Sequence, residues 1–171
     1  MVGWDDAAAY LKQITDWLNK RHDERLQENN LIYVYGPSGS GKTFLLHSVY
    51  AALNCQGKTT TERALFFRMP DFCDAFVDSI LGGKTSAFEQ MIYRAEAVLF
   101  DDVDYLVGKT QTQVEFEKFL NYCLEEYHTL VIVTGSNSPD NLSVSELLWN
   151  RLSWGKVIEL RRNESATDEH R

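Results

Sequence analysis

The sequence predicts an α/β fold in which a parallel sheet of five strands lies between two layers of helices. Short apolar runs alternate with longer segments whose apolar residues recur every three or four positions, as in successive βαβ units. The short runs are apolar throughout, which is typical of strands buried on both faces. With 171 residues and 44% hydrophobic content, the chain has enough apolar mass for one domain with one sizeable core.

The elements of the amino-terminal half have recognisable beginnings and ends. Asp5 and Asp6 are suitable N-caps. Pro70 fits the first turn of a helix that Gly82 ends. The helical segments carry apolar residues on one face, and the strand segments are rich in β-branched and aromatic residues. In order, we expect a helix over 5–21, a strand over 31–35, a helix over 42–54, a strand over 64–68 and a helix over 70–81.

The carboxyl-terminal half continues this alternation. Apolar runs are bounded by acidic or turn-forming residues, and Phe116, Phe119 and Leu120 place one apolar face on a long helix. In order, we expect a helix over 86–95, a strand over 97–101, a helix over 111–127, a strand over 130–134, a helix over 144–152 and a strand over 157–160. The chain then divides into a helix and connector over 1–30, a core over 31–160 and a polar tail over 161–171.

Composition limits the partners that the chain can have. A net charge of −8 argues against a broadly basic surface, so any contact with DNA must be local and sensitive to salt. No stretch approaches the roughly 20 apolar residues of a membrane span, and no signal peptide is recognisable. Three widely spaced cysteines without a metal-binding pattern indicate reduced thiols. We therefore expect a cytoplasmic protein with no membrane contact.

Residues 36–43 read Gly-Pro-Ser-Gly-Ser-Gly-Lys-Thr, a complete G-x-x-x-x-G-K-[ST] phosphate-binding loop between an expected strand and an expected helix. Backbone N–H groups of such a loop converge on a phosphate at the helix N-terminus. Lys42 is then expected to bridge the β- and γ-phosphates of ATP, and Thr43 to bind Mg²⁺. A glycine-rich turn without a ligand is the alternative. The nucleotide-binding residues expected here are Gly36, Pro37, Ser38, Gly39, Ser40, Gly41, Lys42 and Thr43.

Acidic residues that follow the third expected strand supply a second half of this site. If that strand neighbours the first, Asp101 lies beside Thr43 and is the carboxylate on the Mg²⁺ side, while Asp102 orients or deprotonates the attacking water. Alternatively, both acids only cap the end of a strand. After the fourth strand, Asn137 or Ser136 can contact the γ-phosphate or this water, unless the segment is an ordinary polar turn.

Together these motifs resemble the AAA+ ATPases among the P-loop NTPases, and within them the DnaA family of bacterial replication initiators. The resemblance extends from about 30 to 160 and is carried by 35–47, by 98–109 continued through 112–117, and by Asn-Arg-Leu-Ser-Trp-Gly at 150–155. It implies an arginine finger at Arg151 that reaches ATP bound to a neighbouring subunit, and therefore self-assembly. Without that role, Arg151 is an ordinary exposed arginine.

The same resemblance implies single-stranded DNA contacts and an adenine-binding entry. The residues matching the DNA contacts are Val77, Lys109, Gln111 and Thr112. Gln111 replaces the basic residue usual in the family, and Leu147 stands where a further arginine is usual. Val2 and Gly3 resemble the adenine-binding entry of origin-recognition ATPases.

These expectations combine into an ATP-dependent replication initiator core, a slow ATPase that uses ATP or ADP with Mg²⁺ and assembles on DNA. A helicase loader, or a DnaA-regulating AAA+ paralogue acting on the replicative helicase or another AAA+ protein, is the alternative. A non-hydrolysing nucleotide-gated scaffold also stays open, and a small-molecule kinase is less favoured because Asp101, Asp102 and Arg151 have no use there. Since no helical lid or helix-turn-helix follows the fifth strand, we expect an excised core rather than a reduced paralogue.

Overall fold

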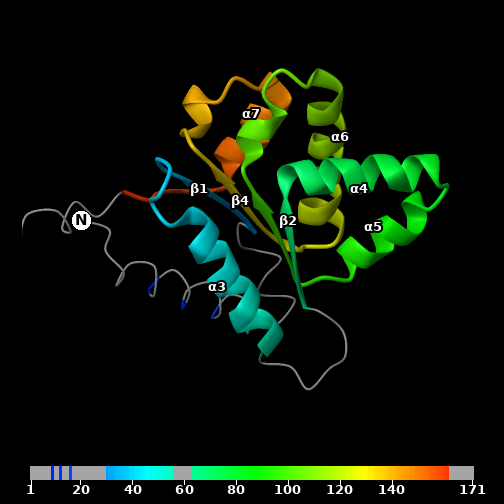
Figure 1. Ribbon diagram of the computed structural model, residues 1–171, viewed down its shortest axis with the longest axis horizontal. Helices are drawn as coiled ribbons and strands as arrows, with labels where there is room; N and C mark the ends of the chain where they lie inside the picture. The colour runs from blue at the N-terminus through cyan, green and yellow to red at the C-terminus, as the bar shows by residue number, and fades with distance from the viewer. Residues whose placement is uncertain (1–8, 10–11, 13–15, 17–29, 56–62, 162–171) are drawn as a thin grey trace, which may run out of the picture.

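A parallel five-stranded sheet forms the centre of the molecule (Figure 1). The computed structural model describes residues 9, 12, 16, 30–55 and 63–161. Within them the strands lie in the order β2-β3-β4-β1-β5, and every neighbouring pair is parallel, which confirms the predicted fold class. The strands are β1 (Leu31–Tyr35), β2 (Ala64–Arg68), β3 (Ala97–Asp101), β4 (Leu130–Gly135) and β5 (Lys156–Glu159).

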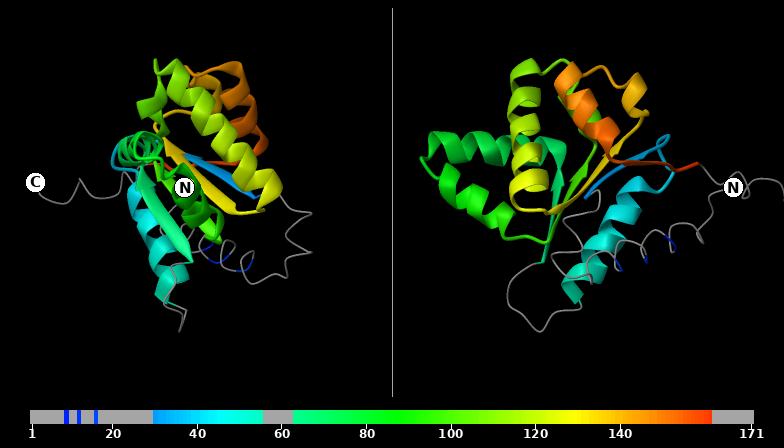
Figure 2. Two further views of the ribbon diagram at one scale, coloured as in Figure 1. Left: turned by 90° about the vertical axis from the view of Figure 1, so that its right-hand side faces the viewer. Right: turned by 180° about the vertical axis from the view of Figure 1, so that it is seen from behind.

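Helices cover both faces of this sheet (Figures 1 and 2). One face packs against α3, and the other packs against the other helices of 63–161, with α4 and α5 forming a hairpin beside the edge strand β2. The helices are α3 (Lys42–Cys55), α4 (Met69–Leu81), α5 (Thr85–Tyr93), α6 (Thr110–Asn121) and α7 (Glu146–Trp154), with the 3₁₀ turns η1 (Val103–Leu106) and η3 (Pro139–Asn141) and the π-helical turn η2 (Tyr122–Glu126).

The two-sided covering explains why the strands are apolar throughout. In β3, Leu99 belongs to the core beneath α3, whereas Val98 and Phe100 belong to the core on the opposite face. The same division separates Ile132 from Val133 in β4. Since successive side chains of a strand point to opposite faces, a strand buried on both sides needs an apolar residue at every position.

The elements predicted between 31 and 160 are confirmed in type, with differences at their ends. The long helix expected over 111–127 is α6, which ends at Asn121 and continues as the π-helical turn η2. The 3₁₀ turn η1 after β3 was not predicted, because four residues carry too little periodicity to distinguish a short turn from a loop. The helix expected over 5–21 lies outside the described residues except for positions 9, 12 and 16, and the tail lies outside them after 161.

Phenylalanine side chains fix the helical layer on the second face. Phe72 of α4 meets Phe100 of β3 edge-on, with 5.0 Å between ring centroids, and Phe100 meets Phe116 of α6 edge-on at 5.1 Å. Edge-to-face pairs of this kind add stabilisation beyond the burial of their area. The start of α4 and the middle of α6 are therefore held against the same strand, which fixes where each helix lies.

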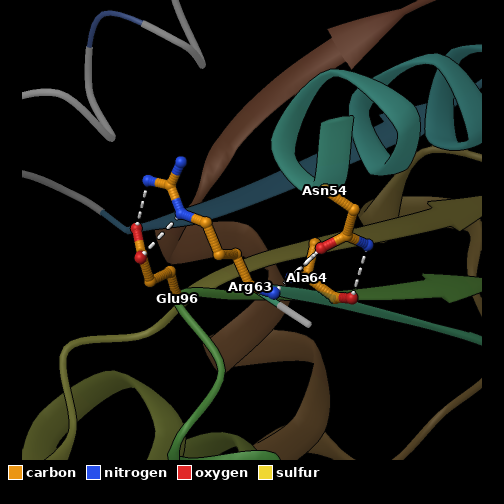
Figure 3. Close-up of polar contacts among 4 residues, drawn as sticks. All are labelled: Asn54, Arg63, Ala64 and Glu96. Atoms are coloured by element: carbon orange, nitrogen blue, oxygen red, sulfur yellow. Dashed lines mark hydrogen bonds and ion pairs between the residues drawn. The ribbon is translucent and has the colours of Figure 1, made fainter. Parts of the chain in front are cut away.

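A polar cluster joins α3 to the beginnings of two strands (Figure 3). The Asn54 side chain donates from Nδ2 to the Ala64 carbonyl (3.1 Å), and its Oδ1 accepts from the backbone N–H groups of Arg63 (2.8 Å) and Ala64 (3.0 Å). Arg63 in turn donates through Nε and a terminal nitrogen to the two carboxylate oxygens of Glu96, both at 2.8 Å. These bonds fix the end of α3 to the starts of β2 and β3.

Replacing Asn54 with Ala removes three hydrogen bonds at once and leaves two half-buried backbone N–H groups without their acceptor. We expect the free energy of unfolding to fall by about 1–3 kcal/mol, measured by urea denaturation. Gln90→Ala is the control, because Gln90 is exposed on α5 and its side chain makes one weak hydrogen bond of 3.5 Å among the described residues, to Ser86. Equal effects of the two substitutions would contradict the role given to Asn54.

Candidate functional site

The glycine-rich loop over 36–43 joins the carboxyl end of β1 to the start of α3. Gly39 and Gly41 have φ values of 80° and 95°, a left-handed conformation that glycine adopts without steric cost. Gly36 is confined by close packing instead, since a Cβ there would lie 2.1 Å from the carbonyl oxygen of Leu160. Its N–H donates to the Gly135 carbonyl at the end of β4 (3.3 Å). The loop is therefore fixed between the ends of two other strand segments.

Lys42 lies over this loop. Its ammonium donates to the carbonyl oxygens of Gly36 (2.6 Å) and Pro37 (3.0 Å). Burial lowers the pKa of Lys42, and the carboxylates of Asp101, Asp104 and Asp102 oppose this shift. The Lys42 ammonium thus lies near three carboxylates at the N-terminus of α3.

Asp101, the last residue of β3, is the most constrained acid of the site. Only 9% of its surface is exposed. Its Oδ2 accepts from the Thr43 hydroxyl (2.8 Å) and its Oδ1 accepts from the Thr134 hydroxyl (2.6 Å). Thr134 also accepts a hydrogen bond from the backbone N–H of Asp102 (3.1 Å). Sequence reasoning did not assign Thr134 to the site, because a threonine at the end of an apolar strand gives no chemical signal of its own.

The condition under which the sequence places Asp101 beside Thr43, that β3 neighbours β1, is not met, because β4 lies between them. Thr43 and Asp101 nevertheless meet, since the first turn of α3 extends across the end of β4 to reach Asp101. The intervening strand supplies Thr134, which occupies the other oxygen of the carboxylate. The pairing predicted for Thr43 and Asp101 is therefore present, through a different strand order.

The oxygen atoms of this site suit a nucleotide with a hard divalent cation. Thr43 and Asp101 present a hydroxyl and a carboxylate side by side, which are ligands that Mg²⁺ prefers. Ser40 Oγ is buried in the loop without a hydrogen-bond partner in the described part of the chain. Within that same part, no three His, Cys, Asp or Glu side chains are grouped as a metal site, so phosphate oxygens and water would have to complete the coordination of Mg²⁺.

Asp102 and Asp104 follow Asp101, Asp102 directly before the turn η1 and Asp104 within it. Asp102 has a φ of 68°, an unusual backbone conformation for a residue other than glycine. Partial burial raises the pKa of Asp102, and so do the neighbouring charges of Asp104 and Asp101 and a hydrogen bond with Asp104, while Lys42 lowers it. A raised pKa makes the Asp102 carboxylate a stronger base than an isolated aspartate, as accepting a proton from water requires.

The segment after β4 brings Ser136 and Asn137 to the same edge of the sheet. Ser136 donates its backbone N–H to Asp104 Oδ2 (2.7 Å), and the buried Tyr33 hydroxyl donates to the Asn137 carbonyl (2.8 Å). Both Ser136 and Asn137 are exposed. The sequence did not single out Asp104 or Tyr33, and the one available signal was a third acid close behind Asp101.

Arg151 lies far from the glycine-rich loop of its own chain. Its guanidinium pairs with Glu125 of η2 (2.8 Å) and lies 5.1 Å from the ring centroid of Trp154. One helical turn further on, Gly155 packs against Leu31, the first residue of β1. Because the loop follows the last residue of β1, about 13 Å of strand separates Gly155 from the loop. Arg151 therefore lies outside the site formed by its own chain.

The residues expected to contact DNA are only partly brought together. Val77 of α4 is 51% exposed, and Lys109 approaches Cys73, one turn before Val77, closely enough to oppose the rise in the pKa of that thiol caused by burial. Lys109 also donates to the Tyr105 carbonyl (2.8 Å) and lies 3.9 Å from the Tyr105 ring centroid. Gln111 instead donates to Glu115 (3.2 Å).

Other residues add little to this surface. Thr112 is half-buried, and the exposed carboxylates on α4 (Asp71, Asp74 and Asp78) make the surroundings acidic. Val2 and Gly3 lie outside the described residues.

A glycine-rich phosphate loop after β1, joined to an acid of β3 across an intervening β4, defines an ATPase core of the AAA+ type. This class has many branches, and comparison with known families identifies the branch. The family described as the bacterial DnaA ATPase domain matches residues 10–159, and the chain belongs to it.

Individual relatives agree with this assignment. The chain is 33% identical over 140 residues to the chromosomal replication initiator protein DnaA 2 of Protochlamydia amoebophila, covering 82% of this chain and 30% of the relative. It thus spans about a third of the length of such curated relatives.

Solved structures give the same result. The structure of AMPPCP-bound DnaA from Aquifex aeolicus has a TM-score of 0.75 at 28% identity and covers 94% of this chain and 48% of that chain. A DnaA structure bound to AMPPCP and single-stranded DNA has a TM-score of 0.69 at 27% identity, covering 86% and 45%. The DnaC helicase loader shares the fold, with a TM-score of 0.70 at 15% identity over 90% of this chain and 89% of the loader. No helix in the described part of the chain is long and apolar enough to cross a membrane.

Replacing Thr134 with Val removes the hydroxyl that donates to Asp101 while nearly preserving volume. One oxygen of a buried carboxylate and the Asp102 N–H then lose their partner. We expect the free energy of unfolding to fall by about 1–3 kcal/mol, measured by urea denaturation in a chelating buffer without nucleotide. Thr110→Val, at an exposed position in the first turn of α6, is the matched control and should change stability by less than about 0.5 kcal/mol. Similar losses in both variants would contradict the importance of the Asp101 contact.

Proposed function

We propose that this chain is the ATP-binding, slowly hydrolysing AAA+ core of a DnaA-like chromosomal replication initiator that assembles on DNA when it holds ATP. The observation that carries the proposal is the hydrogen-bonded series from Thr43 through Asp101 to Thr134, directly beside the phosphate loop. Membership of the DnaA ATPase domain family supports it, as does the AMPPCP bound in a similar DnaA structure.

In this proposal, each group of the site acts on the phosphates or on water. The backbone N–H groups of 36–43 and the N-terminus of α3 hold the phosphates of ATP or ADP, and Lys42 exchanges the carbonyls of Gly36 and Pro37 for phosphate oxygens. Thr43 and Asp101 hold Mg²⁺, which supplies neutralisation of phosphate charge when bound. Asp102 accepts the proton of the attacking water, and Asn137 orients that water.

Arg151 acts, in this proposal, on the nucleotide of a neighbouring subunit. Its described partners, Glu125 and Trp154, lie outside the phosphate loop of its own chain. Exposed apolar neighbours on the same helix, Leu147 (65% exposed) and Trp154 (72% exposed), suit a protein interface. To reach a phosphate, the guanidinium must first leave Glu125. Assembly then replaces the ion pair with Glu125 by one with a phosphate. The net free energy of assembly therefore depends on the charge of the nucleotide.

Single-stranded DNA is the proposed polymer partner, bound through Val77, Lys109, Gln111 and Thr112. A similar DnaA structure holds single-stranded DNA, which supports the proposal. The acidic surroundings of Val77 and the net charge of −8 oppose strong binding by this chain alone. We therefore propose weak binding that decreases as salt increases.

The second candidate function is a helicase loader or a DnaA-regulating AAA+ protein whose partner is another protein. The observation that favours it is the hairpin of α4 and α5, where exposed apolar side chains (Val77, Ile80, Leu81 and Met91) occur with acidic ones instead of a basic surface. Such a surface fits a protein better than a nucleic acid. In either role we place the protein in the cytoplasm, where free thiols such as those of its three cysteines persist.

ATP turnover tests the proposed activity. We expect the wild-type chain to bind ATP and hydrolyse it slowly in the presence of Mg²⁺. Lys42→Ala should weaken binding of ATP and ADP, because the cation facing the phosphates is lost. Asp102→Asn should keep binding but slow hydrolysis by about 100-fold or more, the usual contribution of a general base. Phosphate release and nucleotide binding are measured on the same preparations.

Arg151→Ala supplies the control for action between subunits. If Arg151 completes a neighbouring site, turnover per chain rises with protein concentration in the wild type and not in this variant, while affinity for ATP is the same in both. ATP that stays intact for hours in the wild type, with binding retained, would replace the ATPase proposal by a nucleotide-gated scaffold. Absence of ATP binding would refute the nucleotide site itself.

Retention of labelled oligo-dT on filters distinguishes the initiator from the loader. With ATP, we expect measurable retention by the wild type that is reduced with ADP and reduced further in Lys109→Ala, because one phosphate contact is lost. Gln90→Ala, on the exposed face of α5, is the control. Equal and negligible retention with ATP, ADP and no nucleotide would favour the loader, for which a stable complex with a replicative helicase is the corresponding observation.

A further inference from the structure

The carboxylate of Asp104 raises the pKa of Asp102 but has no further part in the roles proposed so far, although it lies beside the nucleotide site. Its negative charge acts on both Lys42 and Asp102, which places it close to the phosphate loop and to the residue proposed to activate water. Its Oδ2 accepts the backbone N–H of Ser136 at 2.7 Å. Asp104 thus connects the turn after β3 to the segment after β4, across the edge where the γ-phosphate of ATP is proposed to lie.

Asp104 is held on a firm support. The turn η1 that carries it places Val103 and Leu106 in the core, with no exposed surface at either residue. The backbone of the turn is closed by Tyr105 N–H to the Asp102 carbonyl (3.2 Å) and by Val107 N–H to the Asp104 carbonyl (3.0 Å). Because its backbone is already held by buried neighbours, the Asp104 carboxylate loses little conformational freedom when it binds the exposed segment after β4. It can therefore hold that segment in place.

The segment on the other side of this bond is held at each of its residues. Gly135 lies so near the Tyr33 hydroxyl that a Cβ there would be 2.3 Å away, and its carbonyl accepts the Gly36 N–H (3.3 Å). Tyr33 also donates to the Asn137 carbonyl (2.8 Å). Between these contacts, Asp104 is the described partner of the Ser136 N–H. Loss of the Asp104 bond would free the middle of a segment that is otherwise fixed and directly bonded to the phosphate loop.

We infer that Asp104 is a positioning residue that holds Ser136 and Asn137 at the γ-phosphate end of the site, so that the protein distinguishes ATP from ADP. The inference rests on the proposed function, since it assumes that a nucleotide occupies 36–43. Asp104 acts through its hydrogen bond, because a carboxylate charge close to phosphate is by itself unfavourable. Asparagine at 104 keeps an acceptor oxygen for the Ser136 N–H without the charge, whereas alanine removes both.

Two measurements on four proteins test the inference: wild type, Asp104→Ala, Asp104→Asn and Asp140→Ala. Asp140 is an exposed acid on η3 and controls for the loss of one negative charge near the same segment. The first measurement is hydrogen exchange of the Ser136 amide by NMR in the protein without nucleotide. Asp104→Ala should speed this exchange by about tenfold, the factor that corresponds to one hydrogen bond. The other three proteins should agree within about twofold.

The second measurement is the ratio of the dissociation constants for ADP and ATP, with hydrolysis followed in parallel. Asp104→Ala should lower this preference for ATP about tenfold and slow hydrolysis, while its affinity for ADP stays within about twofold of wild type. Asp104→Asn should keep the wild-type ratio. A merely structural role would weaken both nucleotides equally and lower the unfolding midpoint.

The possible failures are distinguishable. A wild-type protein that neither prefers ATP nor hydrolyses it contradicts the proposed function, and this is visible without any variant. The inference itself is overturned if Asp104→Ala leaves the Ser136 amide exchange or the nucleotide ratio of a competent wild type unchanged. It is also overturned if Asp104→Asn is as impaired as Asp104→Ala, since the charge rather than the hydrogen bond would then be responsible.

Discussion

The buried carboxylate of Asp101 is the constraint on which the site depends. Removing a carboxylate from water costs free energy unless hydrogen bonds replace its hydration. Asp101 meets this requirement with two threonine hydroxyls, one from the first turn of α3 and one from the end of β4. The phosphate loop is therefore fixed relative to the sheet by the same bonds that make burial of the acid tolerable. At Asp101, the hydrogen bonds that stabilise the fold also place the carboxylate beside the proposed nucleotide site.

The central place of β4 follows from the strand order. Because β4 lies between β1 and β3, its carboxyl end reaches both the phosphate loop and the acids after β3. Thr134 contacts Asp101, the Gly135 carbonyl accepts from Gly36, and the Ser136 N–H donates to Asp104. Ligands of parallel α/β proteins bind at the carboxyl ends of strands, and this edge is where the polar groups of the protein converge. A strand with almost no chemical signature in the sequence thus organises the site.

The proposed self-assembly rests on the separation of Arg151 from the phosphate loop of its own chain. Arg151 pairs with Glu125 of η2, and its helix ends where Gly155 packs against Leu31, at the end of β1 opposite the phosphate loop. In the proposed assembly, this arginine therefore acts on the nucleotide of a neighbouring chain. Glu125 holds that guanidinium in the isolated chain, with 58% of the Glu125 side chain and 17% of the Arg151 side chain exposed. A partly exposed ion pair contributes little to stability. In the proposed assembly, a phosphate contact between subunits can therefore replace this ion pair at little cost to stability.

The sequence by itself determined the α/β class, the order of the elements, the phosphate loop and the importance of Asp101. These follow from local regularities: helical and strand periodicity, the positive φ values that Gly39 and Gly41 supply, and a motif whose chemistry lies within eight consecutive residues. Tertiary structure alone decided that β4 separates β1 from β3, and that Thr134 and Asp104 join the site. It also paired Arg151 with Glu125. Those contacts connect residues about 30 positions apart in the chain, and local periodicity carries no information about which strands become neighbours.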